Sequence, residues 1–400
     1  MDLNFTPEEL AFRDECRRFF RQEFPEAIRR KVLDGQHLTR EEIVTSHRLL
    51  NARGWATVNW PKEWGGQDWS PVQLYFYQDE MQQAGVPSPL GFNTSMVGPV
   101  IAQFGNQAMK QRFLAKTANL DIWWCQGFSE PGAGSDLAGL RTKAERRGDT
   151  WVINGQKTWT TLAQHADWIF VLCRTNPDVK KQEGISFILA PMDTPGITRR
   201  PIQTIDGGYE VNEIFFDDVV VPAENLVGEV DKGWDYAKFL LGNERTGIAR
   251  VGFSKARLKR IRELAALEHV GSHRVLDDPK FLEKLTAVEI ELKALEMTQL
   301  RVVAGDRKRE KGKPDPASSI LKLRGSQIQQ TSTELLMQVV GPYVMPFAAS
   351  DEGSGRNETG YGPDYAAGAA PAYFNTRKVS IYGGSNEIQR NIIAKAILGF

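Results

Sequence analysis

Apolar residues recur at helical spacing through the first third of the chain. The order Thr-Pro-Glu-Glu from Thr6 to Glu9 places Thr at the N-cap, Pro at the first helical position and Glu at the third, which is a capping box. The apolar residues between Leu10 and Phe20 then follow a rough helical period. Similar start and stop signals predict further helices over residues 41–53, 71–84 and 106–118. The first third of the chain is therefore expected to be helical.

The pattern changes to short β-like runs in the middle of the chain. Thr150–Ile153 and Lys157–Thr160 flank Asn154-Gly155, a pair that is a strong signal for the turn of a β-hairpin. Further apolar runs cover residues 168–173, 185–189 and 214–216, with Pro and Gly between them. From Gly233 onward the helical pattern returns, with long amphipathic stretches over residues 281–304 and 319–340.

This order of helices, strands and helices predicts an α+β fold. It does not fit the βαβ alternation of a doubly wound sheet. We expect three domains: an all-α domain over residues 1–120, a β-domain over residues 121–230 and a helical domain over residues 231–400.

Composition and charge narrow the class of protein. The 400 residues are 41% hydrophobic, and 50 Lys and Arg balance 50 Asp and Glu, so no basic excess points to nucleic acid as a partner. The N-terminus lacks the apolar core of a secretory signal, and no stretch of about 18 uncharged apolar residues predicts a membrane span. A cytoplasmic protein is therefore expected. The three Cys and five His match no metal or disulfide spacing, so we expect no metal site.

The stretch from Ser129 to Asp136, Ser-Glu-Pro-Gly-Ala-Gly-Ser-Asp, carries the clearest chemical signal. Its glycines let the backbone approach a ligand closely, and its hydroxyls can donate hydrogen bonds. The glycines at 132, 134 and 139 do not fit G-x-G-x-x-G, so a dinucleotide fingerprint is excluded. Taken alone, the stretch could be a surface turn.

Three motifs in order resolve that ambiguity. Phe128–Asp136, Asn154–Thr161 and the C-terminal Ile381–Arg390 resemble the acyl-CoA dehydrogenase family, and the similarity covers essentially the whole chain. Within the family, the chain resembles the large subunit of pimeloyl-CoA dehydrogenase and subunits that dehydrogenate steroid side chains. The resemblance implies an N-terminal helical domain, a β-barrel-like middle domain and a C-terminal four-helix bundle. It also implies FAD-dependent α,β-dehydrogenation of an acyl-CoA thioester, with electrons passed to an electron-transfer flavoprotein.

The resemblance assigns the cofactor contacts residue by residue. Phe128 and Ser129 would contact the flavin ring, Trp159 would pack against the isoalloxazine, and Thr161 would hydrogen-bond near N5, the hydride acceptor. Ser385 in the C-terminal motif is a further expected flavin contact. Without the resemblance, Trp159 would be interpreted as a core aromatic of a strand, and Thr161 as an ordinary strand residue.

The catalytic base is the least conventional part of the expected site. Many family members place it as a Glu directly after the Tyr of the C-terminal motif, where this chain has Gly383. In the long-chain and isovaleryl branches the base lies in the helix after the β-domain, just before an Arg, and this chain has Glu244-Arg245 there. Glu244 also falls inside an apolar stripe, three residues after Leu241 and four before Ile248. A carboxylate in that stripe is either buried, as a base needs, or held in a structural ion pair.

Two further residues complete the expected substrate contacts. Ser135 would touch the CoA part of the substrate, and Arg245 would lie on the substrate side, with Gly383 nearby. Glu387 is the other nearby carboxylate, but it falls at the expected start of the last helix, where acids are favoured by the helix dipole.

The contacts between subunits point to a heteromer. Homotetrameric family members use an Arg, a Phe and a Gln to reach a neighbouring subunit's FAD, and this chain has Leu267, Val270 and Asp278 in those places. The Gly-rich turn that serves the neighbouring adenosine is Gly341–Tyr343 here. We therefore expect a homologous partner subunit in a heterotetramer, with a homotetramer as the alternative. A non-catalytic partner subunit and a flavin oxidase or monooxygenase are the competing functions.

Overall fold

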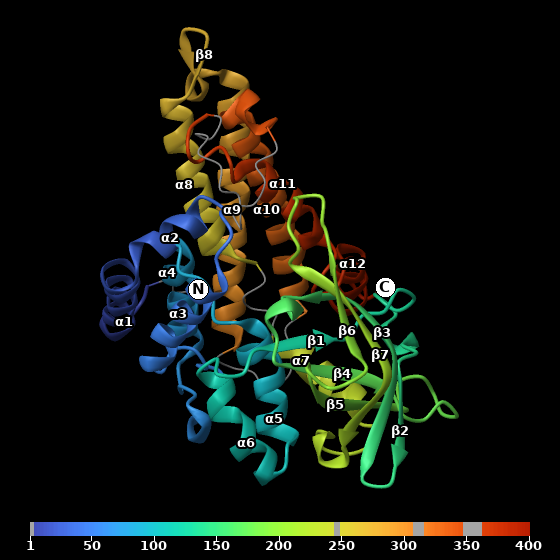
Figure 1. Cartoon of the computed structure of the whole chain (residues 1–400). Coiled ribbons are helices and arrows are strands. Elements are labelled where there is room, and N and C mark those ends of the chain that lie inside the picture. The colour runs from blue at the N-terminus through green and yellow to red at the C-terminus, as the bar shows by residue number, and fades with distance from the viewer. Residues whose placement is uncertain (1–3, 244–248, 307–315, 347–361) are drawn as a thin grey trace.

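The strands come from the middle of the chain and form a sheet that lies to one side of the helices from the two ends of the chain (Figure 1). This is a computed structural model, and it describes residues 4–243, 249–306, 316–346 and 362–400. The arrangement confirms the α+β class and the order of a helical, a sheet and a second helical domain. Over the described ranges, none of the helices combines the length and apolar character needed to span a membrane.

The N-terminal helices begin at strong capping signals. Thr6, Thr39 and Ser70 each cap a helix reciprocally with the Glu or Gln three residues later. The expected helices over 41–53, 71–84 and 106–118 are confirmed, with ends that differ by one residue. The elements are α1 Pro7–Arg18, α2 Glu26–Leu33, α3 Arg40–Ala52, α4 Pro71–Gln83, α5 Gly98–Phe104 and α6 Gln107–Ala118.

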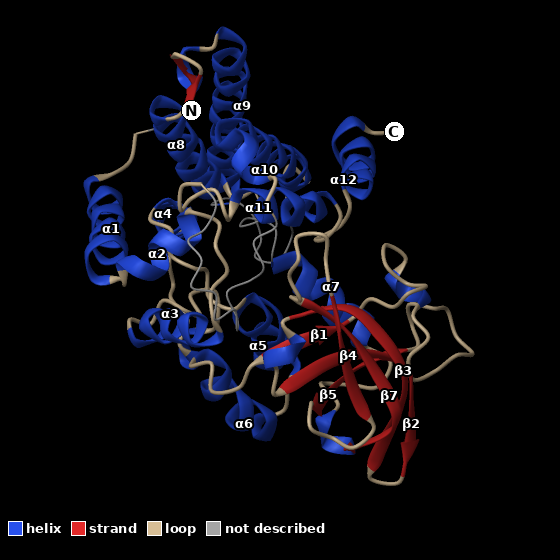
Figure 2. Ribbon diagram, turned by 45° about the horizontal axis from the view of Figure 1, so that its top comes forward, coloured by secondary structure: helices blue, strands red, loops and turns tan. Residues whose placement is uncertain are grey.

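The middle of the chain forms one curled, mixed sheet of seven strands (Figure 2). The strand order is β1-β4-β2-β3-β7-β6, with β5 paired to β4. The β1–β4 pair is parallel, whereas β3 pairs antiparallel with both β2 and β7. The strands are β1 Trp124–Gly127, β2 Lys143–Arg147, β3 Thr150–Thr161, β4 Trp168–Arg174, β5 Ile185–Pro191, β6 Ile197–Ile202 and β7 Val211–Pro222.

The hairpin expected at Asn154-Gly155 is wrong. Both residues lie inside the single strand β3, at a register shift against β7. The Asn154 side chain donates to Asp218 Oδ1 (3.0 Å) and accepts from the Asp218 amide (2.9 Å), so it joins two strands and does not reverse one. Gly155 has φ +146°, and a Cβ there would lie 2.6 Å from the Thr142 Cα. The Asn-Gly pair therefore serves a bulge and a close backbone approach.

A shared apolar core joins the sheet to the neighbouring helices. Trp124, Phe128 and Phe170 from the sheet region pack in one buried cluster with Leu240 of α7 (Gly233–Asn243) and with residues of α5 and α6. Phe128 and Phe170 meet edge to face, with centroids 5.7 Å apart. Phe128, the first residue of the first motif, is thus anchored where the sheet meets the helices.

The C-terminal helices include three long ones that lie alongside one another (Figure 1). Lys255 of α8 contacts Asp79 of α4 (3.0 Å) and Glu296 of α9 (2.5 Å), which ties the two helical regions together. The remaining elements are α8 Val251–Leu267, β8 His269–Val270, β9 His273–Arg274, α9 Pro279–Asp306, α10 Ser318–Val340, α11 Ala369–Thr376 and α12 Asn386–Ile393.

Candidate active site

The loop after β1 is fixed by one inward-facing carboxylate. Glu130 accepts hydrogen bonds from the amides of Arg141 (2.7 Å) and Thr142 (2.9 Å) and pairs with the Lys157 ammonium (2.8 Å). Lys157, on β3, also donates to the carbonyl of Phe128 (3.1 Å). Both side chains of the pair are buried. A buried charge is stable only when it is paired and hydrogen-bonded, and this pair meets that condition.

The pKa values of the pair reflect this setting. Burial alone would raise the pKa of Glu130, but Lys157 and the donors around the carboxylate hold it below its ordinary value. Burial lowers the pKa of Lys157, and the charge of Glu130 opposes that effect. The loop that carries Phe128 and Ser129 is therefore pinned to β3 by an ion pair.

Trp159 projects from a bulge in β3 and is not a core residue. The pairing of β3 with β7 shifts between Lys157 and Thr160, and Trp159 has φ +58°. Its side chain is 60% exposed. A tryptophan with positive φ and an exposed ring is unusual, and such strain concentrates at ligand sites.

The groups around Trp159 fit a flavin. The Thr158 amide donates to the carbonyl of Ser129 (2.9 Å), so the loop lies directly beside the bulge. Across the described ranges, the hydroxyls of Ser129 and Thr161 make no hydrogen bond, and the buried Thr160 hydroxyl also lacks a partner. An exposed aromatic ring beside unused hydroxyl groups suits a planar, polar-edged ring system.

The structure brings Phe128, Ser129, Trp159 and Thr161 together and leaves Ser135 further along the loop. Ser135 is exposed, and its neighbour Asp136 forms an exposed ion pair with Lys181 (2.7 Å). The Ser135 side chain is thus accessible from solvent.

The C-terminal motif is built around two left-handed glycines. Gly383 and Gly384 have φ +65° and +81°, and Ser385 caps α12 by accepting a hydrogen bond from the Ile388 amide (3.4 Å). Asn386 points inward and accepts from the buried Lys322 ammonium of α10 (2.9 Å). Burial lowers the pKa of Lys322 to about 8. The motif is therefore anchored through a neutral amide, with no acid at position 383.

An ion pair links the region beside β3 to the residues that precede the C-terminal motif. Glu210, just before β7, accepts a hydrogen bond from the Leu162 amide through its carbonyl (2.7 Å), beside Thr161. Its carboxylate pairs with Lys378, which precedes the C-terminal motif, and accepts from Asn375 of α11 (3.3 Å). Asp206 on the same connection also accepts from Asn375 (2.7 Å). We call Asp206, Glu210, Asn375 and Lys378 the interdomain clasp.

The expected base and its neighbour, Glu244 and Arg245, lie outside the described residues. The competing carboxylate, Glu387, is exposed in the first turn of α12 and pairs with Arg390 (3.4 Å). Backbone and Ser385 hydrogen bonds lower the pKa of Glu387. A general base for a weak carbon acid needs the opposite shift, so Glu387 is poorly suited to that role.

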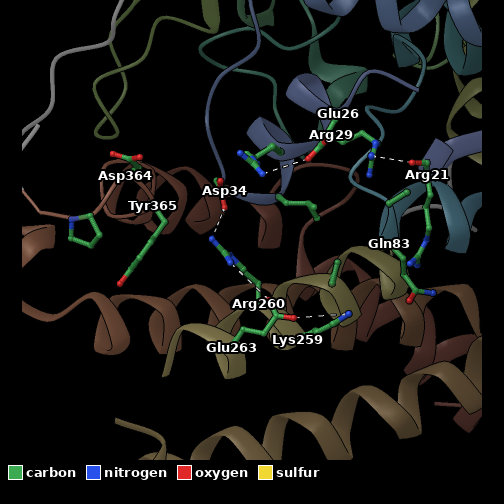
Figure 3. A pocket seen from close by; sticks show the side chains of 15 residues that line it. Arg21, Glu26, Arg29, Asp34, Gln83, Lys259, Arg260, Glu263, Asp364 and Tyr365 are labelled. Atoms are coloured by element: carbon green, nitrogen blue, oxygen red, sulfur yellow. Dashed lines mark hydrogen bonds and ion pairs between the residues drawn. The ribbon is translucent and has the colours of Figure 1, made fainter. Parts of the chain in front are cut away.

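A cavity of about 860 Å³ lies elsewhere, between α2, the end of α4, α8 and residues 363–365 (Figure 3). Its wall alternates in charge: Arg30 contacts Glu26 (3.5 Å), and Arg260 contacts Asp34 (3.4 Å). None of the expected site residues lines it. A flavin ring needs apolar walls, so this cavity is no candidate for the cofactor.

Sequence reasoning missed Glu130, Lys157 and the clasp. An unbroken strand alternation that would mark Lys157 as buried is absent, because the register shift of β3 between Ile153 and Gly155 interrupts it. The clasp residues carry no such pattern, because they come from connections distant in sequence. Within the described residues, no group of three or more His, Cys, Asp or Glu could hold a metal ion.

Comparison with known proteins gives a consistent picture. Models of the N-terminal, middle and C-terminal domains of acyl-CoA dehydrogenase match residues 6–121, 125–219 and 231–398. Acyl-CoA dehydrogenase IpdE1 of Mycobacterium tuberculosis is 36% identical over 368 residues, which is 91% of this chain and 89% of that protein.

Solved structures resemble the whole chain. A chain of the ChsE4-ChsE5 complex from Mycobacterium tuberculosis is 32% identical with a TM-score of 0.82, and the match covers 100% of this chain and 99% of that one. A chain of the Tcur3481-Tcur3483 steroid ACAD is 29% identical with a TM-score of 0.84 and the same coverage.

Proposed function

Because the chain belongs to the acyl-CoA dehydrogenase family, whose members are FAD-dependent enzymes, we propose that it oxidises an acyl-CoA thioester to the trans-2-enoyl-CoA, with Glu244 as the base. The observation that carries the proposal is the Phe128–Ser129 loop, pinned by a buried ion pair beside the exposed Trp159. Such a loop presents fixed polar groups to a ligand, as preorganised catalysis requires.

This geometry supports the cofactor half of the proposed site. FAD, when bound, supplies the acceptor for the hydride that leaves the β carbon. Ser129 and Thr161 would hold it by their unused hydroxyls, Trp159 would cover its ring, and Phe128 would contact it from the loop. Ser385 would add a contact from the start of α12.

The substrate half centres on Glu244, which would remove the α proton. An α proton of a thioester is a very weak acid, so the pKa of the base must be raised by burial and the carbonyl must be polarised. The apolar stripe around Glu244 in the sequence supports that role. Ser135 and Arg245 would contact the CoA moiety. Gly383, which leaves space where many relatives carry an acid, would border the acyl chain.

The partner of this chain is a second part of the proposal. Two similar structures carry names of two-component complexes, ChsE4-ChsE5 and Tcur3481-Tcur3483. Leu267 and Val270 stand in place of the Arg and Phe that homotetrameric members direct to a neighbouring FAD. Both are exposed, at the end of α8 and in β8, at the tip of the bundle (Figure 1). We propose a heterotetramer with a homologous chain. An active homotetramer of purified chain with one FAD per subunit would contradict it.

The substrate and electron acceptor complete the proposal. The similarity to a chain of a steroid acyl-CoA dehydrogenase supports a bulky acyl chain, such as a steroid side chain, with a dicarboxylic acyl chain as the other class. The electrons would pass to an electron-transfer flavoprotein.

The test is anaerobic flavin reduction. The chain, co-expressed with its homologous partner, is mixed with a panel of acyl-CoAs while the flavin absorbance is followed and the product is identified by mass. We expect bleaching and a product lighter by two hydrogens. Bound FAD that no acyl-CoA bleaches would overturn the proposal. An absence of FAD with and without partner would favour a non-catalytic subunit, and rapid reaction of the bleached enzyme with oxygen would favour an oxidase.

A further inference from the structure

Two arginines at the beginning of α8 share one aromatic ring. Arg250, directly before the helix, lies with its guanidinium carbon 4.7 Å from the centroid of Phe253, and Arg257 lies 4.5 Å from the same centroid. Phe253 and Arg257 are four residues apart, so they occupy one face of the helix. Arg250 has φ +48°, a left-handed conformation that ends the preceding connection. The ring thus holds two cations close together.

These two arginines differ from the other cations of α8. Lys255 pairs with Asp79 and Glu296, Arg260 with Asp34, and Arg262 with Glu289 (2.7 Å). Across the described ranges, the guanidiniums of Arg250 and Arg257 make no ion pair and no hydrogen bond. The cation–π contacts to Phe253 therefore supply their only described stabilisation.

The environment of Arg257 makes its positive charge unfavourable without a neighbouring anion. Burial first, and then the positive charge of Arg250, lower the pKa of Arg257 to about 9. The Arg257 side chain is only partly exposed, whereas Arg250 is exposed. A partly buried guanidinium beside a second cation destabilises the protein until an anion joins the pair.

The position of the pair connects it to the proposed site. Leu240 of α7 packs in the same apolar cluster as Phe128, and Arg250 follows ten residues later. The proposed base Glu244 falls between them in sequence. Both arginines therefore follow the proposed base closely along the chain, six and thirteen residues after it.

We propose that Arg250 and Arg257 form a binding site for an anionic group of the acyl-CoA ligand. The site rests on the proposed function only in that the ligand is an acyl-CoA. Guanidinium groups bind carboxylates and phosphates through the same charged hydrogen bonds. The anion is therefore either a carboxylate at the far end of the acyl chain or a phosphate of CoA.

Calorimetry of the FAD-loaded enzyme, with its partner subunit where assembly requires it, distinguishes these sources. The probes are pimeloyl-CoA, which ends in a carboxylate, heptanoyl-CoA, which is neutral at that end, and free CoA, all added anaerobically. The variants are Arg250→Met, Arg257→Met and Arg257→Lys, which keeps the charge. Arg18→Met on α1, an exposed arginine far along the chain, is the matched control.

If the site binds a terminal carboxylate, each Arg→Met variant should raise the dissociation constant of pimeloyl-CoA roughly tenfold to a hundredfold. The dissociation constants of heptanoyl-CoA and CoA should stay unchanged. A phosphate site predicts an equal loss for all three probes. Arg257→Lys should keep most of the affinity, and Arg18→Met all of it. If Arg257→Met fails to fold, the exposed Arg250→Met variant carries the same test.

Unchanged dissociation constants in both Met variants would overturn the site, and so would an equal loss in Arg18→Met. The proposed function fails independently, when wild-type enzyme binds the probes but no acyl-CoA bleaches its flavin. The two results are therefore separable.

Discussion

The first and last motifs of the proposed site differ in the direction they face. The loop from Phe128 to Asp136 turns its key charge inward, where Glu130 meets Lys157 and two backbone amides. The C-terminal motif leads into α12, which buries two polar side chains, Asn386 and Gln389. The same segment leaves large apolar side chains exposed, namely Ile381, Tyr382, Ile388, Ile397 and Leu398.

The difference shows which motif is fully packed within this chain and which one leaves a surface for another chain. The first motif satisfies its buried polar groups within one domain, so its geometry is fixed before any ligand arrives. The helix α12 is held by its polar side chains, because Asn386 bonds to Lys322 and Ser326 of α10 (3.0 Å to Ser326). Its apolar side chains are left facing solvent. An apolar face turned to solvent is typical of a surface that another protein covers. We therefore expect changes in the first motif to affect the cofactor site, and changes in the last motif to affect assembly with another chain.

The largest effect is expected from breaking the inward-facing pair. Glu130→Gln or Lys157→Met leaves one buried charge without its partner and should lower the free energy of unfolding by about 3–5 kcal/mol. Urea denaturation measures it. The double variant should be milder than either single variant, since no charge is stranded. Lys181→Met, which removes an exposed ion pair to Asp136, should cost no more than about 1 kcal/mol. Equal losses at both pairs would contradict the comparison.

The same pair predicts a response to acid. The folded-state pKa of Glu130 is depressed, so its contribution is present above the unfolded pKa, near 4.5, and is lost as the pH falls through the lower folded value. Stability curves measured from pH 6 downward should therefore fall more steeply below about pH 4.5 in wild type than in the double variant Glu130→Gln with Lys157→Met. Parallel curves would show that the carboxylate titrates alike in both states.

The interdomain clasp should have a smaller effect, on the cofactor. Lys378→Met or Glu210→Gln removes a partly exposed ion pair that holds the C-terminal motif near Thr161. Such a pair contributes about 1 kcal/mol, so its loss should raise the dissociation constant of FAD roughly fivefold. Titration of the apoprotein with FAD measures it. The charge swap Glu210→Lys with Lys378→Glu should recover part of the affinity. The matched control is Lys116→Met, an exposed lysine of α6. Equal weakening in the swap and the single variants would refute the clasp.

The smallest change in stability is expected on the outward face. Ile388→Ser and Ile397→Ser replace exposed side chains, so the free energy of unfolding of the isolated chain should change by less than about 0.5 kcal/mol. Assembly with the co-expressed partner, followed by sedimentation velocity, should nevertheless weaken. Asn391→Ser, an exposed polar position of α12, is the control. Undiminished assembly in both Ile variants would show that this face is not the contact.

The sequence predicted what local rules determine. Capping residues such as Thr6 and Ser70 fixed the beginnings of the helices, because a cap acts within three residues. Asn154-Gly155 was misinterpreted because its partner, Asp218, lies on another strand and only tertiary pairing turns the signal from a hairpin into a bulge. Glu130 and Lys157 both lie within the family motifs, but the sequence does not predict their ion pair, because the pair depends on how the loop packs against β3.

The family motifs carried the site further than periodicity did. Trp159 looked like a core residue by pattern, whereas its backbone at φ +58° turns it out of the sheet. No local rule predicts that conformation for a tryptophan. The outward face of α12 was also not foreseen, since the sequence shows an amphipathic helix without showing which face is buried.

The central claim is the identity of the base, and rapid mixing of enzyme with acyl-CoA under anaerobic conditions tests it most directly. Glu244→Gln should retain FAD and bind the acyl-CoA, while the rate of flavin bleaching falls at least about a thousandfold. Glu387→Gln, which alters the exposed carboxylate of α12, should bleach at close to the wild-type rate. Undiminished bleaching in Glu244→Gln, or a loss confined to Glu387→Gln, would contradict the account and move the base to the C-terminal motif.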